Sequence, residues 1–381
     1  MTESAYRHAK FVRKLFFVTG TRADYGKLEP LALAAIEAGH HVTFFVTGMH
    51  MLEKYGLTKE EVHYQKSFNV FEFINQRDGD QQDIILAKTI SGFSDFLQEH
   101  RPDLVIIHGD RVEALACSLV CATNYVRCAH VEGGEVSGTI DEQFRHCNTK
   151  LSTVHLVSSE KAKARVERLG EPSDSIYVIG SPELDIHGRS SGVTLDEVKK
   201  RYNITATDYG ICVFHPVTSE VADMGKQAEA LFGALIDSRR SYVVILPNND
   251  PGSESILSVI HKLPSDRFRV LPSMRFAYFS ELMRNANAII GNSSIGVREA
   301  PFLGVPSLDI GTRQFNRGVA PSLVRCSPLD RKSIDSFLDD FWGRRFDRNQ
   351  SFGSGSASRS FVELLGQDAF WEHSTQKYFV E

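Results

Sequence analysis

The stretch Leu15-Phe-Phe-Val-Thr-Gly-Thr-Arg-Ala-Asp-Tyr-Gly26 decides the fold of this chain. It begins with a short apolar run and passes directly into a polar turn of small residues. An apolar run of this length is typical of a parallel strand that is covered by helices on both faces. We therefore predict the first strand of a parallel α/β sheet at residues 15–19.

The same order of apolar run, polar turn and helical stretch recurs along all 381 residues. The predicted strands cover residues 15–19, 41–47, 103–108, 126–131, 154–158, 175–179, 211–215, 242–247, 268–271, 288–291 and 307–310. Helical patterns separate them, for example at residues 27–38, 82–99, 111–122, 221–237 and 276–285. This alternation, repeated twice, predicts two doubly wound α/β domains.

A polar stretch, Gly188-Arg-Ser-Ser-Gly192, marks the boundary between the two domains. We predict a first domain at residues 1–183, a second at 184–360 and a C-terminal helical segment at 361–381. The Gly/Ser-rich residues 351–360 predict a mobile loop, and residues 370–379 predict a terminal helix.

Composition excludes several classes of function. The formal net charge of -5 argues against a nucleic-acid-binding protein, and no apolar run approaches the roughly 20 residues of a membrane span. The short apolar run at residues 15–18 cannot be a signal-peptide core, so a cytoplasmic protein is expected. The six cysteines form no C-x-x-C pair, which favours small buried side chains over disulfides.

Familiar ligand motifs are missing from the sequence. It contains no G-x-G-x-x-G, no phosphate-binding G-x-x-x-x-G-K-[ST] and no zinc spacing such as H-E-x-x-H. One D-x-D, Asp78-Gly-Asp80, lies in a polar loop away from any strand end and is interpreted as a turn. We therefore expect neither a metal nor a nicotinamide cofactor.

Polar residues gather where the predicted strands end, which is where open α/β sheets bind ligands. Two such domains facing each other would form one cleft. Arg22, Arg111 and Arg313 each follow a strand closely, and their forked donors suit a diphosphate. Gly291-Asn-Ser-Ser-Ile-Gly296 is typical of a small-residue turn before a helix. Ser293 and Ser294 either cap that helix or help to hold an anion.

Acidic residues form the second group at the strand ends: Asp110, Glu132, Glu135, Asp141 and Glu142. Asp110 and Glu132 end neighbouring strands and should lie close together. Asp141 and Glu142 open a helix, where acids also complement the helix dipole. A cluster of carboxylates can divide acid and base roles, because like charges push their pKa values apart. Glu299, in the turn after Ser294, would receive ribose hydroxyls or complement a helix dipole.

These segments together resemble the hydrolysing UDP-N-acetylglucosamine 2-epimerases. The resemblance rests on the order and spacing of seven motifs. They are Thr19-Gly-Thr-Arg-Ala-Asp-Tyr-Gly26, Val46-Thr-Gly-Met-His50, His108-Gly-Asp-Arg111, Glu132-Gly-Gly-Glu-Val-Ser-Gly-Thr-Ile-Asp141 with Arg145-His146, Phe214-His-Pro-Val-Thr218, Gly291-Asn-Ser-Ser294 and Gly311-Thr-Arg313.

The resemblance implies a GT-B-like architecture, in which two Rossmann-like domains hold a nucleotide sugar in the cleft between them. It implies catalytic roles for Asp110, Glu132 and Asp141, with His215 also at the reaction centre. It implies UDP contacts from the residues that match the family's binding motifs: Arg22, Arg111, His215, Ser293, Ser294, Glu299 and Arg313. It also implies a homodimer or a dimer of dimers.

The reaction implied is conversion of UDP-N-acetylglucosamine and water to N-acetylmannosamine and UDP, for sialic acid or capsule synthesis. UDP first leaves C1 as the C2 proton is removed, and water then adds to the resulting acetamidoglucal. Ala23-Asp24 favours this branch over non-hydrolysing epimerases, whose first loop has Pro-Glu there. A branch acting on a diacetamido-trideoxy sugar stays open, as does the choice of C2 base among Asp110, Glu132 and Asp141.

Two other classes of function compete. A glycosyltransferase of the same fold would need an acceptor site and gives no reason for so many acids after one domain's strands. A non-enzymatic nucleotide-sugar sensor would keep Ser293, Ser294 and Arg313 but would not need Asp110 and Glu132 together. Turnover of the nucleotide sugar alone distinguishes the enzyme from both.

Overall fold

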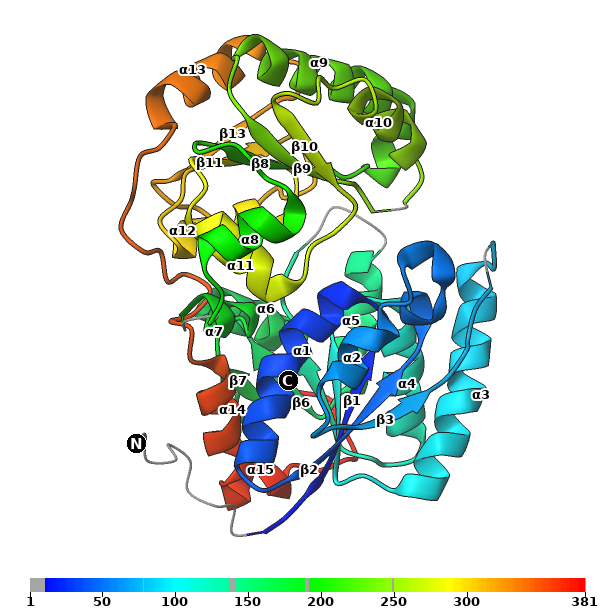
Figure 1. Ribbon diagram of the computed structural model, residues 1–381. Helices are drawn as coiled ribbons and strands as arrows, with labels where there is room; N and C mark the ends of the chain where they lie inside the picture. The colour runs from blue at the N-terminus through cyan, green and yellow to red at the C-terminus, as the bar shows by residue number, and fades with distance from the viewer. Residues whose placement is uncertain (1–10, 78, 137–140, 189–191, 249, 381) are drawn as a thin grey trace. The chain divides into compact units, whose positions relative to one another are not determined.

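The computed structural model describes residues 11–77, 79–136, 141–188, 192–248 and 250–380 (Figure 1). The chain divides into two compact units. The first unit comprises Met1–Glu135, Ile140–Gly188 and Phe352–Glu381, and the second comprises Val136–Thr139 and Arg189–Ser351. The end of the chain therefore belongs to the first unit, whereas the sequence suggested a separate segment at 361–381.

The first unit contains a seven-stranded parallel sheet, in the order β3-β2-β1-β4-β5-β6-β7. Its strands are β1 (Lys14–Thr19), β2 (His41–Val46), β3 (Asn69–Glu72), β4 (Leu104–His108), β5 (Cys128–Val131), β6 (Val154–Val157) and β7 (Ile176–Val178). Its helices are α1 (Arg22–Glu37), α2 (Lys59–Tyr64), α3 (Gln82–His100), α4 (Val112–Thr123), α5 (Asp141–Leu151), α6 (Glu160–Arg168), α7 (Glu183–Gly188), α14 (Ala357–Leu365) and α15 (Asp368–Glu372).

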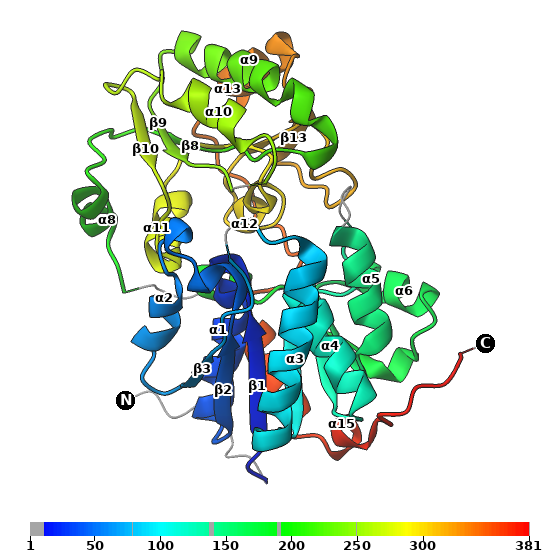
Figure 2. The same cartoon turned by 90° about the vertical axis from the view of Figure 1, so that its right-hand side faces the viewer.

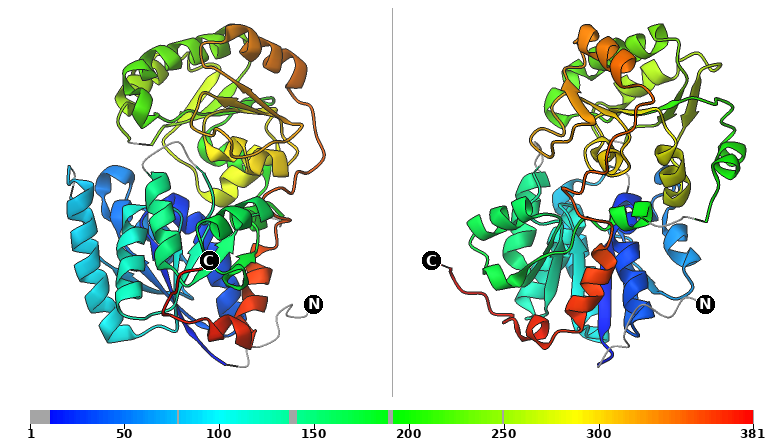
Figure 3. Two further views of the ribbon diagram at one scale, coloured as in Figure 1. Left: turned by 180° about the vertical axis from the view of Figure 1, so that it is seen from behind. Right: turned by 90° about the vertical axis from the view of Figure 1, so that its left-hand side faces the viewer.

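Alternate residues of β1 supply two separate cores, because successive side chains of a strand point to opposite faces. Leu15 and Phe17 pack with α1 and α14, which lie side by side on one face of the sheet (Figure 3). Phe16 and Val18 pack with α3 and α4 on the other face (Figure 2). Burial on both faces explains why the run at residues 15–18 is apolar throughout.

The second unit contains a six-stranded parallel sheet, in the order β10-β9-β8-β11-β12-β13. Its strands are β8 (Gly210–Val213), β9 (Tyr242–Ile245), β10 (Phe268–Leu271), β11 (Ala288–Gly291), β12 (Ser307–Ile310) and β13 (Leu323–Cys326). Its helices are α8 (Leu195–Tyr202), α9 (Met224–Asp237), α10 (Ser253–Ile260), α11 (Phe276–Arg284), α12 (Glu299–Phe302) and α13 (Arg331–Phe341). One core packs α9, α10 and α13 on the sheet, and the other packs α8 and α11.

The two doubly wound parallel sheets confirm the predicted fold class. The sequence missed β3 and β13, each at one edge of its sheet, because neither contains a fully buried residue or a continuous apolar run. The predicted mobile loop at residues 351–360 is wrong in its second part, where α14 begins. There the Asp185 carboxylate accepts hydrogen bonds from the backbone N–H groups of Ala357 (2.8 Å) and Ser358 (2.7 Å).

The predicted helix at residues 370–379 is also wrong beyond Glu372, where α15 ends. Lys377 instead extends its ammonium group to the backbone carbonyls of Lys150 and Ser152, each at 2.8 Å. No described helix of either unit is long and apolar enough to cross a membrane.

Candidate active site

Glu132 is the centre of a buried polar cluster at the carboxyl edge of the first unit's sheet. It follows β5 directly and has a left-handed backbone conformation with φ of 63°. Its Oε2 accepts hydrogen bonds from Lys27 Nζ (2.8 Å) and His108 Nε2 (3.1 Å). The Ser181 hydroxyl lies 2.6 Å from Glu132 Oε1 and 2.8 Å from Glu183 Oε2, and it can donate its single proton to one of them at a time. Two donors on Oε2 fit an ionised carboxylate, which can only accept hydrogen bonds.

Lys27 belongs to this cluster, although the sequence did not single it out. Its ammonium group lies 2.8 Å from Glu132 and 3.3 Å from Glu183, and both carboxylates are almost fully buried. Lys27 immediately follows the first motif and lies on α1, so its proximity to a polar strand end was the available signal. Two buried acids share one cation here, which lowers the cost of their burial.

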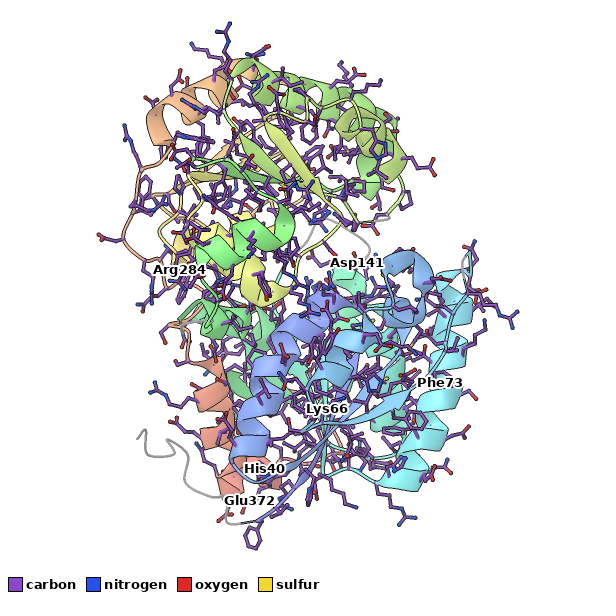
Figure 4. The ribbon with its side chains drawn as sticks, viewed as in Figure 1. His40, Lys66, Phe73, Asp141, Arg284 and Glu372 are labelled. Carbon is purple, nitrogen blue, oxygen red and sulfur yellow. The ribbon has the colours of Figure 1, made fainter. Side chains whose placement is uncertain are left out.

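Asp110 is linked to the helix that Asp141 begins. The carboxylate of Asp110 pairs with the guanidinium of buried Arg145, which lies on α5 one turn after Asp141. Asp141 is the first residue of that helix (Figure 4). A second Arg145 nitrogen donates to the Glu135 carbonyl at 3.2 Å. The structure therefore connects Asp110 to α5 through one arginine.

Asp24 has a structural role at the start of α1. Its carboxylate accepts hydrogen bonds from the backbone N–H groups of Gly20 and Thr21, both at 3.0 Å. Thr21 caps the helix in return and completes a capping box. The pair Ala23-Asp24, which favours the hydrolysing branch in the sequence, therefore also shapes the first loop.

Arg22 and Arg111 are paired with carboxylates within the first unit. Arg22 Nε donates to Glu61 at 2.9 Å, and Arg111 Nε donates to Glu113 at 3.2 Å. Both arginine side chains keep about a third of their surface exposed, at 32% and 37%. Each guanidinium is therefore held from one side and open to solvent on another.

His215 lies at the carboxyl end of β8 in the second unit and is held through its backbone by Asn292. The His215 N–H donates to Asn292 Oδ1 at 2.7 Å, and Asn292 Nδ2 donates to the His215 carbonyl at 2.8 Å. The His215 ring accepts a hydrogen bond at Nδ1 from the Asn248 N–H (3.0 Å). The ring proton must therefore be on Nε2.

The charge state of His215 follows from its surroundings. Burial, and then the positive charge of Arg313, lower the pKa of His215 to about 3. The ring is neutral at physiological pH and can donate one hydrogen bond from Nε2 to an acceptor. This state suits a phosphate or sugar oxygen that needs a neutral donor.

Asn292 also organises the loop that follows β12. Its carbonyl accepts hydrogen bonds from Arg313 Nη1 (3.3 Å) and Gln314 Nε2 (2.9 Å). Asn292 is buried, and it joins the ends of β8, β11 and β12. Asn292 lies within one of the sequence motifs, but the spacing of that motif predicts no role for it.

The turn after β11 differs from the predicted one. Ser294–Gly296 is a single 3-10 turn, and the following α12 has four residues. Ser293 occupies the N-cap position, but its hydroxyl makes no capping hydrogen bond. The capping interpretation of Ser293 is therefore wrong. The predicted helix is here a 3-10 turn followed by the four-residue α12. Glu299 begins α12 and is buried.

Asp80 forms an ion pair with Lys88 at 2.6 Å, in keeping with a turn, whereas Asp78 lies outside the described residues. Within the described ranges, His, Cys, Asp and Glu side chains form no group of three that could hold a metal ion. The buried thiols of Cys117, Cys121 and Cys212 have pKa values raised by burial, which fits unreactive core side chains.

Comparison with known proteins places these features in a family. A family model described as UDP-N-acetylglucosamine 2-epimerase matches residues 34–366. The chain is 41% identical over 376 residues to a UDP-N-acetylglucosamine 2-epimerase of Neisseria meningitidis serogroup B, covering 97% of this chain and 99% of that protein. It is 32% identical to a UDP-N,N'-diacetylbacillosamine 2-epimerase (hydrolyzing) of Legionella pneumophila, covering 93% of this chain and 96% of that protein.

A solved structure supports the fold. The chain matches UDP-GlcNAc 2-epimerase from Neisseria meningitidis bound to UDP-GlcNAc with a TM-score of 0.78 and 18% identity, covering 92% of this chain and 99% of that one. Likeness at this identity concerns the fold. It confirms the predicted pair of Rossmann-like units of the GT-B-like type.

Proposed function

Because this chain belongs to the UDP-N-acetylglucosamine 2-epimerase family, we propose that it is a hydrolysing member, which converts UDP-N-acetylglucosamine and water to N-acetylmannosamine and UDP. The observation that best supports catalysis is the Glu132 carboxylate, which Lys27, His108 and Ser181 contact at the edge of the first sheet. A pure binding protein has no need of a buried acid constrained in this way.

The first stage removes the C2 proton and breaks the bond from C1 to the UDP oxygen, so that a double bond forms between C1 and C2. A carboxylate takes the proton, and Asp110, Glu132 and Asp141 are the candidates. UDP carries the electron pair away as an anion. The second stage adds water, with hydroxide bonding to C1 and a proton to C2 on the opposite face from the one removed.

The second unit is proposed to hold UDP. Arg313 supplies positive charge, and the Ser293 and Ser294 hydroxyls supply donors at the end of β11. The neutral His215 ring offers Nε2–H without adding a charge that would compete with the arginine. Glu299 is proposed to receive the ribose hydroxyls, and Arg22 and Arg111 of the first unit contribute further donors. Charge-assisted donors of this kind also stabilise the departing UDP.

Product analysis tests the proposal. The protein is incubated with UDP-N-acetylglucosamine alone, in buffer containing EDTA, and the products are followed by proton NMR. We expect free N-acetylmannosamine and UDP to accumulate in equal amounts. UDP-N-acetylmannosamine at equilibrium with substrate would assign the chain to the non-hydrolysing branch. Activity that requires an added divalent ion would contradict the metal-independent mechanism.

The substrate is the second point of comparison. The Legionella relative is named for a diacetylated sugar nucleotide, whereas the more similar Neisseria relative is named for UDP-N-acetylglucosamine. A parallel incubation with UDP-N,N'-diacetylbacillosamine should give a kcat/KM lower by at least tenfold. A higher kcat/KM for the diacetylated sugar would move the chain to that substrate and leave the hydrolytic chemistry unchanged.

A further inference from the structure

Glu113 is a buried carboxylate to which the proposed reaction gives no role. It lies in the first turn of α4, two residues after Arg111, and its side chain is only 1% exposed. Oε2 accepts the hydrogen bond from Arg111 Nε at 3.2 Å, whereas Oε1 is buried and has no hydrogen-bond partner within the described part of the chain. Burying a carboxylate with one unpaired oxygen lowers the stability of the fold, which suggests that Glu113 has a functional role.

The loops after β1 and β2 leave room for this carboxylate by having glycine at the points of contact. A Cβ on Gly48 would lie 2.6 Å from Glu113 Oε1, and Gly48 has a left-handed φ of 64°. A Cβ on Gly20 would lie 3.2 Å from the carboxylate carbon. Glu113 therefore lies against the loops that follow β1 and β2, and it is more deeply buried than its partner Arg111.

Among the residues that the structure describes, Glu113 holds Arg111 along one edge of its guanidinium. Its guanidinium is a planar fork in which Nε and the two terminal nitrogens point in fixed directions. Glu113 takes the Nε side, and the side chain of Arg111 is 37% exposed while its partner is 1% exposed. The negative charge of Glu113 is the main cause of a raised Arg111 pKa, so the guanidinium stays charged. This geometry leaves the terminal nitrogens as the edge that can donate to an incoming anion.

We propose that Glu113 is a positioning residue, which fixes the Arg111 guanidinium through Nε so that its two terminal nitrogens face the diphosphate of the nucleotide sugar. This inference rests on the proposed role of Arg111 in binding UDP. An arginine side chain that is already held in one orientation loses less conformational entropy when the ligand binds than a side chain that the ligand must order. Glu113 thus acts on affinity through Arg111 and does not touch the ligand.

A double-mutant cycle in UDP affinity tests this role. Calorimetry would compare the wild type, Glu113→Ala, Arg111→Ala and the double variant. Arg111→Ala should weaken UDP binding roughly tenfold or more, and Glu113→Ala roughly fivefold. The double variant should bind no more weakly than Arg111→Ala, because Glu113 has nothing left to position. Glu113→Gln, which keeps an acceptor for Nε, should stay within about threefold of the wild type.

Two outcomes would overturn the role of Glu113 while the wild type still binds UDP. One is unchanged affinity in folded Glu113→Ala, and the other is the same fivefold loss in the wild-type and Arg111→Ala backgrounds. A wild type that does not bind UDP would overturn the proposed function itself. If Glu113→Ala does not fold, Glu113→Asp takes its place in the cycle, because it withdraws the carboxylate by one methylene.

Glu171→Gln is the matched control. Glu171 is another buried carboxylate of the first unit, paired with Lys150 and Lys377 and hydrogen-bonded to His155. Its substitution should lower the melting temperature and leave UDP affinity unchanged. An equal loss of affinity in Glu171→Gln would show that removing any buried acid of this unit has the same effect, and would overturn the specific role of Glu113.

Discussion

The carboxyl edges of the two sheets differ in the side chains that they bury. In the first unit, Glu132, Glu183 and Glu113 are buried carboxylates held by lysine or arginine. In the second unit, the corresponding edge has the neutral ring of His215 and the guanidinium of Arg313. Under the proposed function, the first edge supplies the acids that transfer protons, and the second edge supplies most of the groups that bind the anion. The difference lies in the residues that follow each strand.

The largest expected effect concerns the acids of the first unit. Replacing Glu132 by Gln, or Asp110 or Asp141 by Asn, should lower kcat by roughly 10²–10⁴-fold, because proton transfer is lost. UDP affinity should change little, since the second unit is proposed to supply most of it. Steady-state kinetics and calorimetry on the same preparations measure both quantities. Equal losses in kcat and in UDP affinity would contradict the proposal that these acids transfer protons and that the second unit supplies most of the UDP affinity.

Asp141 requires a separate control because it also begins α5. An acid at a helix start complements the helix dipole, typically by 0.3–1 kcal/mol. If Asp141→Asn lowers the melting temperature but retains wild-type turnover per folded molecule, Asp141 has a structural role only. Asp110 and Glu132 would then be the acids that transfer protons.

The second unit offers a contrasting acid, Asp309 on β12. Burial raises the pKa of Asp309 to about 6, although Arg325 at 3.0 Å opposes the shift. The folded protein therefore binds more protons than the unfolded chain between pH 3.8 and 6, and stability falls as pH rises through that window. Asp309→Asn should remove this loss. The free energy of unfolding of the variant, relative to that of the wild type, should therefore be larger at pH 7.5 than at pH 4, by as much as about 3 kcal/mol.

Urea unfolding of wild type and Asp309→Asn at pH 4 and pH 7.5 gives this difference directly. The free energy of unfolding of Asp309→Asn minus that of the wild type should increase as pH rises. A difference that stays constant would show that Asp309 has an ordinary pKa, and a difference that decreases would show that its ion pair with Arg325 stabilises the fold.

Arg313 should show the effect on ligand binding that the acids do not. Losing one charge-assisted hydrogen bond costs roughly 1.5–3 kcal/mol, which weakens affinity by about tenfold or more. Calorimetry of Arg313→Ala with UDP should show this loss while the melting temperature stays close to that of the wild type. Unchanged affinity would remove Arg313 from the site.

The smallest expected effect is that of pH on substrate binding through His215. With its pKa lowered to about 3, His215 stays neutral from pH 8 down to pH 5. Binding of UDP-N-acetylglucosamine to the Glu132→Gln variant should therefore show no inflection near pH 6.5. Tighter binding as pH falls through 6.5 would mean that His215 gains a proton in the complex and acts as a cation.

Much of the fold could be predicted from the sequence, because central parallel strands need continuous apolar runs. The strands β3 and β13 could not, because neither contains a fully buried residue and their polar and apolar side chains are mixed. The start of α14 could not be predicted either, since the Asp185 carboxylate that caps it lies 172 positions away in sequence. Long-range contacts override the local preference of a Gly/Ser-rich stretch.

The candidate site divides in the same way. Residues that directly follow strands, such as Asp110, Glu132 and His215, were found because the carboxyl ends of parallel strands meet at one edge. Lys27, Glu113 and Asn292 were not found as site residues. Their importance depends on which side chains they contact, and no spacing in the sequence reveals those contacts.

Isotopic labelling of the products distinguishes hydrolysis from reversible epimerisation, because it follows the C2 proton and the C1 oxygen separately. The reaction is run in D₂O and, in a second sample, in ¹⁸O-labelled water. A hydrolysing enzyme should give N-acetylmannosamine with deuterium at C2 and ¹⁸O at C1, and UDP that is free of label because the bond from C1 to oxygen breaks. Deuterium at C2 in UDP-N-acetylmannosamine, without ¹⁸O in any free sugar or steady accumulation of UDP, would contradict it.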